Sequence, residues 1–318
     1  MANATAGGPG RISGDGSIAA RAPAKVNVHL GVGPLRPDGY HALRTVYLAV
    51  SLFDTVTVRP GNGLSVTLAG EGAADGAVPT DRRNLVWQAA ELLARHAGVP
   101  ADAALHVDKS IPAAGGLAGG SADAAATLVA LDALWGTRAT RGDLTALAAQ
   151  LGSDVPFSLV GDVALGTGHG EELSPVLARR RTDWVLGIAA DGLSTPAVYA
   201  ELDRMREAGT VPADGTLASP EPLIAALRSG PPSAVAAALS NDLQVPATRL
   251  RPDLRRALQA ATDAGARGVL VSGSGPTVAA LVADAEAAVR VAATLADEGL
   301  FRTVRAVHGP VHGARLVG

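Results

Sequence analysis

The sequence of 318 residues contains no cysteine, which excludes disulfide bonds and cysteine-ligated metal sites. Aromatic residues make up only 3% of it, so the core must be built mainly from Ala, Val and Leu. Small aliphatic side chains of this kind suit layered structures in which Ala-rich helices lie close to sheets. The length is sufficient for two domains of ordinary size.

A block of charge of one sign is also missing. The formal net charge is −3, from 27 Lys and Arg residues and 30 Asp and Glu residues. Binding of nucleic acid or of an acidic membrane as a main function needs a concentrated basic patch. We therefore expect neither nucleic acid nor membrane among the partners, and the sequence indicates no obligate protein partner.

Long apolar runs are absent as well. The most apolar stretches, Val185–Ala190 and Val278–Val282, have the length of strands and not of membrane-spanning helices. Residues 1–17 are rich in Gly, Ala and Ser and carry no apolar region typical of a signal peptide, so we interpret them as a disordered tail. These absences predict a soluble, cytoplasmic protein.

The order of the expected elements places the strands first. Ile18–Val32 alternates as a strand does, and Val46–Val58 contains two extended runs with a turn at Phe53–Asp54 between them. A helix over Asn84–His96 and a strand over Ala104–Lys109 follow. This order predicts an α+β fold and not a regularly alternating α/β fold.

Two helices, over Ser121–Trp135 and Asp143–Leu151, come next, and each ends at a glycine. Beyond Gly161–Gly170 the pattern changes to a buried strand, several short helices and two strands around a Gly-Ser-Gly turn. We therefore expect two domains, residues 18–165 and residues 166–318.

The segment Pro112–Ser121, with the sequence PAAGGLAGGS, lies between an expected strand and an expected helix. Phosphate oxygens need several converging backbone N–H groups, and glycine lets the backbone come that close and adopt positive φ. The helix that begins at Ser121 adds free N–H groups and the positive end of its dipole. The segment therefore predicts a phosphate-binding loop, with a glycine-rich packing turn as the alternative.

Three better-known motifs are excluded by spacing. A Walker A loop needs Lys after its second glycine, whereas Ser121 follows Gly120 here. The chain contains neither the G-x-G-x-x-G of dinucleotide-binding folds nor the G-x-S-x-G of a nucleophile elbow.

Three further segments carry polar residues in apolar surroundings. They are Ala22–Val28, Leu151–Phe157 and Val271–Thr277, which contain Lys25 with Asn27, Asp154, and the Gly273-Ser274-Gly275 turn. Taken singly, each has a simpler interpretation: a solvated lysine, a helix N-cap and a hairpin turn.

Together and in this order, the glycine-rich loop and these three segments resemble the GHMP kinase superfamily, which includes galactokinase, homoserine kinase and mevalonate kinase. Pro37–His41 and Asn84–Val86 sharpen the match to the branch that acts in the non-mevalonate isoprenoid pathway. That resemblance extends over roughly residues 18–310. It implies ATP-dependent phosphorylation of the 2-hydroxyl of a small molecule that carries a cytidine diphosphate group.

The resemblance also implies a two-domain GHMP kinase fold: an ATP-binding N-terminal domain like domain 2 of ribosomal protein S5, and a ferredoxin-like C-terminal substrate domain. ATP and acceptor would meet between them. Asp154 would accept the proton of the attacking hydroxyl or orient it, and Lys25 would stabilise the charge on the transferring phosphoryl group.

The residues implied for ATP are Asn84, Lys109, Pro112, Ala113, Ala114, Gly115, Gly116, Leu117, Ala118, Gly119, Gly120, Ser121 and Ala122. Those implied for the acceptor are Asn27, Tyr40, His41, Thr195, Tyr199, Gly273, Ser274 and Gly275. A pyrimidine needs aromatic planes and a few fixed polar groups, so we expect Tyr40 and Tyr199 to enclose the cytosine and His41 to bind its edge. Packing roles for both tyrosines are the alternative.

The loop departs from the usual pattern of the family at Ala114, Ala118 and Ala122. Because Ala122 replaces a hydroxyl residue, the ligands of the expected Mg²⁺ stay unassigned. Two other functions remain open: a kinase for another alcohol such as homoserine or mevalonate, and an S5-like nucleic-acid or nucleotide-binding module without catalysis.

Overall fold

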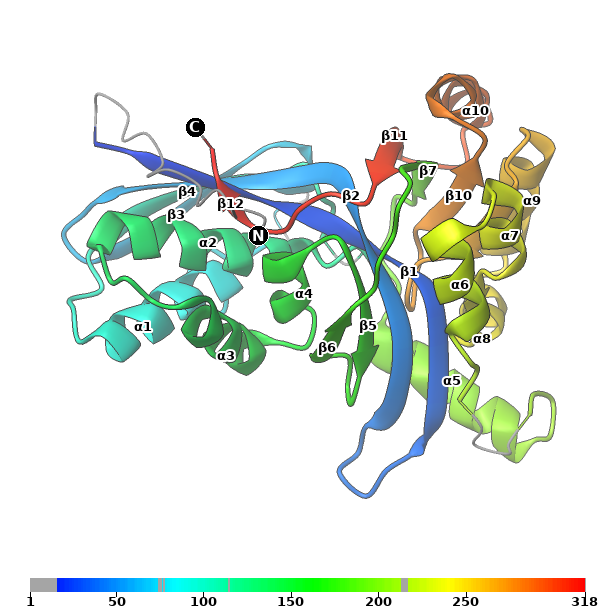
Figure 1. Ribbon diagram of the computed structural model, residues 1–318, viewed down its shortest axis with the longest axis horizontal. Helices are drawn as coiled ribbons and strands as arrows, with labels where there is room; N and C mark the ends of the chain where they lie inside the picture. Colours follow the sequence, from blue (N-terminus) through cyan, green and yellow to red (C-terminus); the bar gives the residue numbers. More distant parts are fainter. Residues whose placement is uncertain (1–15, 74–75, 77, 114, 213–216, 318) are drawn as a thin grey trace, which may run out of the picture.

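The computed structural model describes residues 16–73, 76, 78–113, 115–212 and 217–317, and most of the expected tail, together with Ala114 of the loop, lies outside them. Two sheets with helices packed against them make up the described chain (Figure 1). The first sheet consists of β1 (Ile18–Leu35), β2 (His41–Pro60), β3 (Leu64–Ala69), β4 (Ala103–Asp108), β5 (Val163–Thr167), β6 (Glu172–Pro175), β8 (Ser240–Asn241) and β12 (Arg315–Leu316).

Long antiparallel pairing of β1 with β2 forms the spine of this sheet, whose main path runs β12-β1-β2-β4-β3. A short 3₁₀ helix, η1 (Glu71–Ala73), follows β3. Four helices cover one face of the sheet: α1 (Leu85–Ala97), α2 (Gly119–Trp135), α3 (Arg141–Leu151) and α4 (Val155–Val160).

Local sequence explains where these helices begin and end. The Asn84 side chain accepts a hydrogen bond from the Val86 amide and so caps α1, and Thr140 and Asp143 form a capping box on α3. Gly98 and Gly136 end α1 and α2 in the left-handed conformation. Most of helix α2 between Ala122 and Leu131 is buried, in keeping with its alanine-rich sequence.

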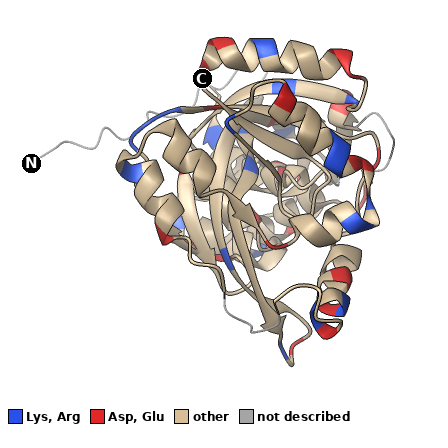
Figure 2. Ribbon diagram, turned by 90° about the vertical axis from the view of Figure 1, so that its right-hand side faces the viewer, with Lys and Arg blue, Asp and Glu red and all other residues tan. Residues whose placement is uncertain are grey.

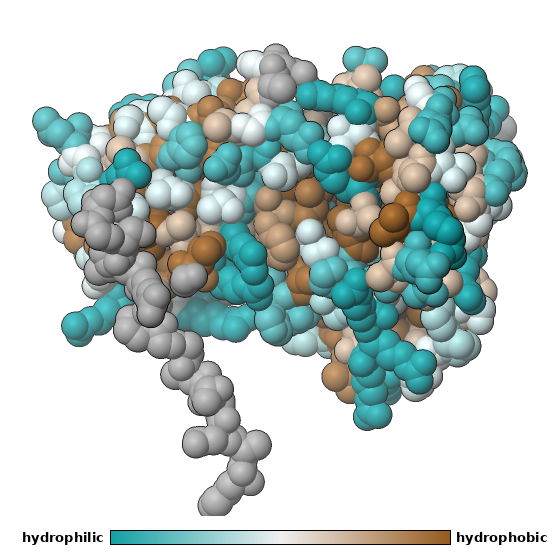
Figure 3. Space-filling model, turned by 90° about the horizontal axis from the view of Figure 1, so that it is seen from above, coloured by the Kyte–Doolittle hydropathy of each residue, from teal (hydrophilic) through white to brown (hydrophobic). Residues whose placement is uncertain are grey.

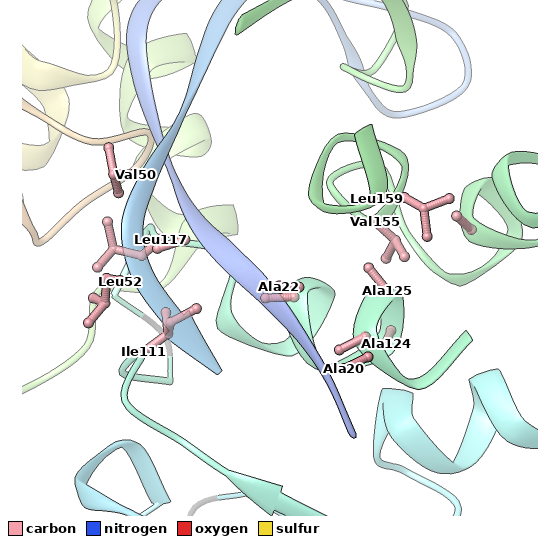
Figure 4. Packing of buried hydrophobic residues seen from close by; sticks show 14 of the residues in the cluster. Ala20, Ala22, Val50, Leu52, Ile111, Leu117, Ala124, Ala125, Val155 and Leu159 are labelled. Atoms are coloured by element: carbon pink, nitrogen blue, oxygen red, sulfur yellow. The ribbon is translucent and has the colours of Figure 1, made fainter. Parts of the chain in front are cut away.

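Alanine lets α2 lie close to the sheet. Ala20 and Ala22 of β1 pack in the same core as Ala124 and Ala125 of α2, and Val155 and Leu159 join them from α4 (Figure 4). The alanine side chains in this cluster are fully buried. The aliphatic, aromatic-poor core expected from composition is therefore present.

The second sheet contains β7 (Thr182–Ile188), β9 (Gly268–Val271), β10 (Val278–Val282) and β11 (Thr303–Gly309), in the order β11-β7-β10-β9 with every pair antiparallel. Numbered within this unit, the order is 4-1-3-2, as in a ferredoxin-like fold. Its helices are α5 (Thr195–Glu207), α6 (Glu221–Ser229), α7 (Pro232–Ala237), α8 (Gln244–Leu250), α9 (Asp253–Asp263) and α10 (Ala285–Asp297). The expected two-domain α+β fold is confirmed.

One expected turn is wrong. The region 46–58 is part of a single long strand, β2, and no turn separates two strands at Phe53–Asp54. The irregularity there is a shift in register: Pro23 pairs with Phe53, whereas Ala24 pairs with Val50. Asp54 looked like a turn residue, but it is buried in the strand because Lys109 and two backbone amides bind its carboxylate.

The chain crosses between the sheets more than once. The expected boundary at residue 165 lies within β5, and pairing in the first sheet continues through β6 to Pro175. Strands β8 and β12, from the second half of the chain, also pair with β1. The division at residue 165 stays a prediction, and strand pairing favours a boundary after β6.

Charged residues of both signs are interspersed over the surface, as Figure 2 shows for one side of the molecule. Seen from above, apolar residues form small patches separated by polar ones (Figure 3). Within the described part of the chain, no helix is both long and apolar enough to span a membrane.

Candidate active site

A cavity of about 1020 Å³ lies among the glycine-rich loop, the β1–β2 hairpin, α5 and the Gly-Ser-Gly turn. It gathers most of the residues that the sequence singled out, from both halves of the chain. The expected residues that line it are Lys25, Asn27, Tyr40, His41, Gly115, Gly116, Ala118, Gly119, Gly120, Ser121, Asp154, Thr195, Tyr199, Gly273 and Ser274.

Backbone hydrogen bonds hold the loop between the two sheets. The Leu117 carbonyl accepts from the Lys25 amide at 3.1 Å, and the Gly115 carbonyl accepts from the Thr277 amide at 3.3 Å. Gly116 has φ +77°, and a Cβ atom there would lie 2.4 Å from the Ser272 carbonyl oxygen. Only glycine fits this position. Gly116 therefore meets the packing alternative for the loop, and this does not exclude phosphate binding by the residues that follow it.

The loop leads directly into the N-terminus of α2. Ala118 precedes the helix with φ 59°, and the first intrahelical bond runs from the Ala122 amide to the Ala118 carbonyl. The amides of residues 119–121 therefore precede the first turn's hydrogen bonds and lie on the cavity wall. Free amides and the positive end of a helix dipole suit an anion without a basic side chain, so phosphate binding at this end stays a prediction.

Lys25 and Asp154 form an ion pair on the wall of this cavity. The Nζ atom of Lys25 lies 3.6 Å from Oδ2 of Asp154 and donates a 2.5 Å hydrogen bond to Oδ1 of Asn27. The lysine side chain is 7% exposed and the Asp154 side chain 28% exposed. Asp154 occupies the N-cap position of α4 but makes no capping hydrogen bond, so its carboxylate is available to the cavity.

Tyr47, which the sequence analysis missed, lies under this pair. It is 2% exposed, its ring centre is 5.7 Å from Nζ of Lys25, and it packs on Phe157. Burial raises the pKa of the Tyr47 phenol well above its ordinary value, and the charge and hydrogen bonding of the nearby Asp154 carboxylate raise it further. The phenol therefore stays protonated beside the carboxylate.

At the hairpin end, the cavity carries rings and carboxylates. Nε2 of His41 is hydrogen-bonded to Oδ1 of Asp203 at 2.9 Å, and the His41 ring centre lies 5.1 Å from that of Tyr199. Tyr40 is 61% exposed and lies 4.7 Å from the ring of His169. The two tyrosines line the same cavity, and each is packed against a histidine.

Burial raises the pKa of the Tyr199 phenol, and the Asp154 charge adds to that shift. Tyr199 is half-buried. This burial is what the alternative of a packing role for Tyr199 would predict.

The Gly273-Ser274 turn forms the remaining wall. Asn241 fixes it by donating to the carbonyls of Val271 and Gly273, both at 2.7 Å. Ser274 and Thr195 share a hydrogen bond of 2.8 Å, which ties the turn to the start of α5. Gly275 and the loop residues Leu117 and Ala122 do not appear on the wall of this cavity.

Lys109, which the resemblance implies for ATP, does not line this cavity, and its contact with ATP stays a prediction. Its ammonium group is buried between Oδ2 of Asp54 at 2.7 Å and Oδ2 of Asp123 at 2.5 Å, and the residue is 2% exposed. Burial lowers the pKa of this ammonium, but the Asp123 and Asp54 charges outweigh burial and leave it raised. The side chain ties β2, the end of β4 and α2 together beneath the loop.

Asn84 likewise uses its side chain locally, in capping α1 and donating to the Pro79 carbonyl at 2.6 Å. Pro112 and Ala113 border a separate cavity of about 150 Å³ on the other side of Gly115. The contacts of these residues with ATP stay predictions.

Several cavity residues gave no clear signal in the sequence. Tyr47 lies in an apolar strand, and His169 and Glu171 lie in a glycine-rich turn. Asp203 follows Tyr199 by four positions on α5. Residues with this spacing lie on the same face of a helix, so the spacing could have identified Asp203 as a cavity residue.

The residues of the cavity fit a Mg²⁺ ion whose ligands come mainly from the phosphates of ATP. Among the described residues no group of three or more His, Cys, Asp or Glu is arranged to hold a metal ion. Ser121 and Asp154 both bring oxygen atoms to the wall of the cavity, and Mg²⁺ commonly takes one or two protein ligands together with substrate phosphates.

Comparison with known proteins shows the family to which the chain belongs. The model of the GHMP kinases N terminal domain matches residues 84–162, and the model of the GHMP kinases C terminal region matches residues 223–299. A crystal structure of 4-(cytidine 5'-diphospho)-2C-methyl-D-erythritol kinase is 35% identical, with a TM-score of 0.74, over 94% of this chain and 99% of that chain. A mevalonate kinase from L. major in complex with R-mevalonate, 15% identical with a TM-score of 0.70 over 92% of this chain and 96% of its own, shares the fold.

Two relatives are much more similar in sequence. A 4-diphosphocytidyl-2-C-methyl-D-erythritol kinase from Nocardia farcinica is 56% identical over 300 residues, which are 94% of this chain and 96% of the relative. The kinase of the same name from Mycobacterium tuberculosis is 55% identical over 302 residues, 95% of this chain and 93% of the relative. The chain belongs to the 4-diphosphocytidyl-2-C-methyl-D-erythritol kinase family of the GHMP kinases.

Proposed function

We infer that the chain transfers the γ-phosphoryl group of ATP to the 2-hydroxyl of 4-diphosphocytidyl-2-C-methyl-D-erythritol, a step of the non-mevalonate route to isoprenoid precursors. The observation that carries this inference is the Lys25–Asp154 pair, which lines the same cavity as the N-terminus of α2. Identity above 50% over almost the whole chain supports the same acceptor as in the relatives.

Asp154 is the group we assign to the proton of the attacking hydroxyl. An alcohol has a pKa far above that of a carboxylic acid, so the proton is transferred late, as the new P–O bond forms. Lys25 lies close enough to Asp154 to stabilise its charge, and Asn27 fixes the lysine through the 2.5 Å hydrogen bond. The same ammonium group then faces the charge that develops on the transferring phosphoryl group.

The glycine-rich loop is the group we assign to the phosphates of ATP. The free amides of residues 119–121 and the dipole of α2 favour an anion there. Mg²⁺, when bound with ATP, would neutralise phosphate charge, and Ser121 and Asp154 are the residues we propose to supply protein oxygen ligands. Lys109 acts beneath the loop as a support, because its ammonium group is sealed between two carboxylates.

The hairpin end of the cavity is the part we assign to the cytidine of the acceptor. Tyr40, His41 and Tyr199 line it, and they supply flat faces together with a hydrogen-bonding edge. The tail of the acceptor would then reach Asp154 past Asn27 and the Gly273-Ser274 turn. We place this reaction in the cytoplasm, where ATP is available.

A coupled ADP-release assay against a panel of hydroxyl acceptors tests the assignment. We expect turnover with 4-diphosphocytidyl-2-C-methyl-D-erythritol and at most weak turnover with homoserine or mevalonate. Faster turnover with either of those alcohols would contradict the proposed acceptor. ATP binding without turnover of any acceptor would favour a non-catalytic nucleotide-binding module.

A further inference from the structure

The hydrogen bond between His41 and Asp203 fixes which ring nitrogen of the histidine carries a proton. Nε2 of His41 lies 2.9 Å from Oδ1 of Asp203. An ionised carboxylate only accepts hydrogen bonds, so Nε2 must be the donor. In the neutral imidazole the proton on Nε2 leaves Nδ1 as an acceptor. Among the described residues Nδ1 has no hydrogen-bond partner of its own, so it is the nitrogen left for a ligand.

The surroundings leave the ring little freedom to exchange the two nitrogens. The His41 side chain is 5% exposed, and the Tyr199 ring packs on it from the same helix that carries Asp203. Arg206, one turn further along α5, donates to the carbonyls of Val32 and Gly33 on the opposite strand of the hairpin. Helix α5 and the hairpin are thus joined at two points.

The identity of the free ring nitrogen matters for a pyrimidine. Cytosine presents an exocyclic amino group, which donates, at the position where uracil presents a carbonyl oxygen, which accepts. A histidine whose free nitrogen accepts matches the amino group and repels the carbonyl oxygen. A histidine whose free nitrogen donates has the reverse preference.

We propose that Asp203 is a positioning residue that holds His41 in the Nε2–H tautomer and thereby makes the acceptor site select a cytosine base over a uracil base. This inference rests on the proposed function, since it places the cytidine of the acceptor beside His41. Asp203 acts through His41, and the charge of the carboxylate is what forces the tautomer.

The tautomer itself is measurable without any substrate. Long-range ¹H–¹⁵N spectra of the uniformly labelled protein at about pH 8, above the ordinary titration range of histidine, report which nitrogen of each ring is protonated. A His41→Gln variant assigns the signals. We expect protonated Nε2 and unprotonated Nδ1 in the wild type. A proton on Nδ1 instead would overturn the proposal, whether or not the protein is a kinase.

The functional arm compares the wild type with Asp203→Asn. An asparagine amide can donate to Nε2, which frees His41 to carry its proton on Nδ1. We expect the ratio of CDP affinity to UDP affinity, measured by calorimetry, to fall about tenfold or more, as the loss of a specific base contact predicts. The KM for ATP should stay unchanged, and the Nδ1 signal should move toward the protonated form.

Glu207→Gln removes a charge from an exposed position on the same helix and serves as the matched control. It should leave the CDP to UDP ratio unchanged. If folded Asp203→Asn keeps the wild-type ratio of CDP affinity to UDP affinity, the proposal is overturned while the kinase assignment stays intact. Absence of CDP binding by the wild type would instead contradict the cytidine site on which the inference rests, and the tautomer measurement would still decide the role of Asp203.

Discussion

Nζ of Lys25 lies 3.6 Å from Oδ2 of Asp154, in contact with the cavity, whereas Nζ of Lys109 lies 2.7 Å and 2.5 Å from two carboxylates that are sealed from solvent. The sequence suggested a functional role for both lysines. Their surroundings separate them: the first ion pair borders the space where substrates meet, and the second is enclosed by the core. The charge of Lys25, which has one carboxylate partner and borders the cavity, is therefore the one able to act on a ligand.

Asp154→Asn should lower kcat by about 10²–10⁴-fold, the range typical of a positioned acid–base group. The amide keeps the size of the side chain but loses the charge that attracts the proton of the hydroxyl. The assay is ADP release at saturating ATP and acceptor, with circular dichroism to show that the variant is folded. A folded variant with near-normal kcat would refute the assignment of Asp154.

Gly116→Ala should raise the KM for ATP by at least tenfold. The added Cβ would lie 2.4 Å from the Ser272 carbonyl oxygen at a φ of +77°, so the loop must move. Gly142→Ala, in α3, is the matched control, because its Cβ would meet only Thr140 Oγ1 at an ordinary 3.6 Å. If ATP binds equally well to both variants, the phosphates do not use this loop.

Lys109→Met should destabilise the fold by about 3–5 kcal/mol, because it leaves Asp54 and Asp123 facing each other in the core without a cation. Urea unfolding measures the loss. The KM for ATP of the protein that remains folded should change little. If stability is unchanged and the KM for ATP is much higher, the direct contact of Lys109 with ATP that the resemblance implied would be supported instead.

Tyr47 should make stability fall in alkali. In the unfolded chain its phenol ionises near pH 10, whereas burial and Asp154 raise the pKa in the folded protein well above that value. Above about pH 10 the unfolded state has therefore lost a proton that the folded state retains, so this contribution to stability is present below that pH and is lost as the pH rises. Tyr47→Phe should lose less stability between about pH 9 and 11 than the wild type. If the free energy of unfolding of the two proteins falls equally over this pH range, the raised pKa of Tyr47 is contradicted.

Tyr199→Ala should raise the KM for the acceptor about tenfold or more, since an aromatic plane beside a base contributes about 1–3 kcal/mol. The KM for ATP should stay within about twofold. Tyr199→Phe keeps the plane and should restore acceptor binding. Equal loss toward both substrates would show that Tyr199 serves packing alone.

The sequence by itself determined the position of α2 and of the glycine-rich loop before it, for which it predicts phosphate binding, whereas the roles of Lys25 and Asp154 came from the resemblance to the GHMP kinases. The loop and the helix follow from local chain order. Close backbone approach to an anion requires glycine, a helix start requires free amides after the loop, and Gly152 and Pro156 place Asp154 at the beginning of a short helix. An alanine-rich core likewise follows from composition, because few other apolar residues were present to fill it.

Only the tertiary structure decided which polar residues are buried supports and which face the cavity. Lys109 and Asp54 looked like a ligand contact and a turn residue, yet they neutralise each other within the core. Tyr47 lies against Asp154, and Asp203 against His41, through contacts between segments far apart in the chain. Local pattern carries no information on such pairs, because their charges and hydrogen bonds are matched only when the sheets and helices have packed.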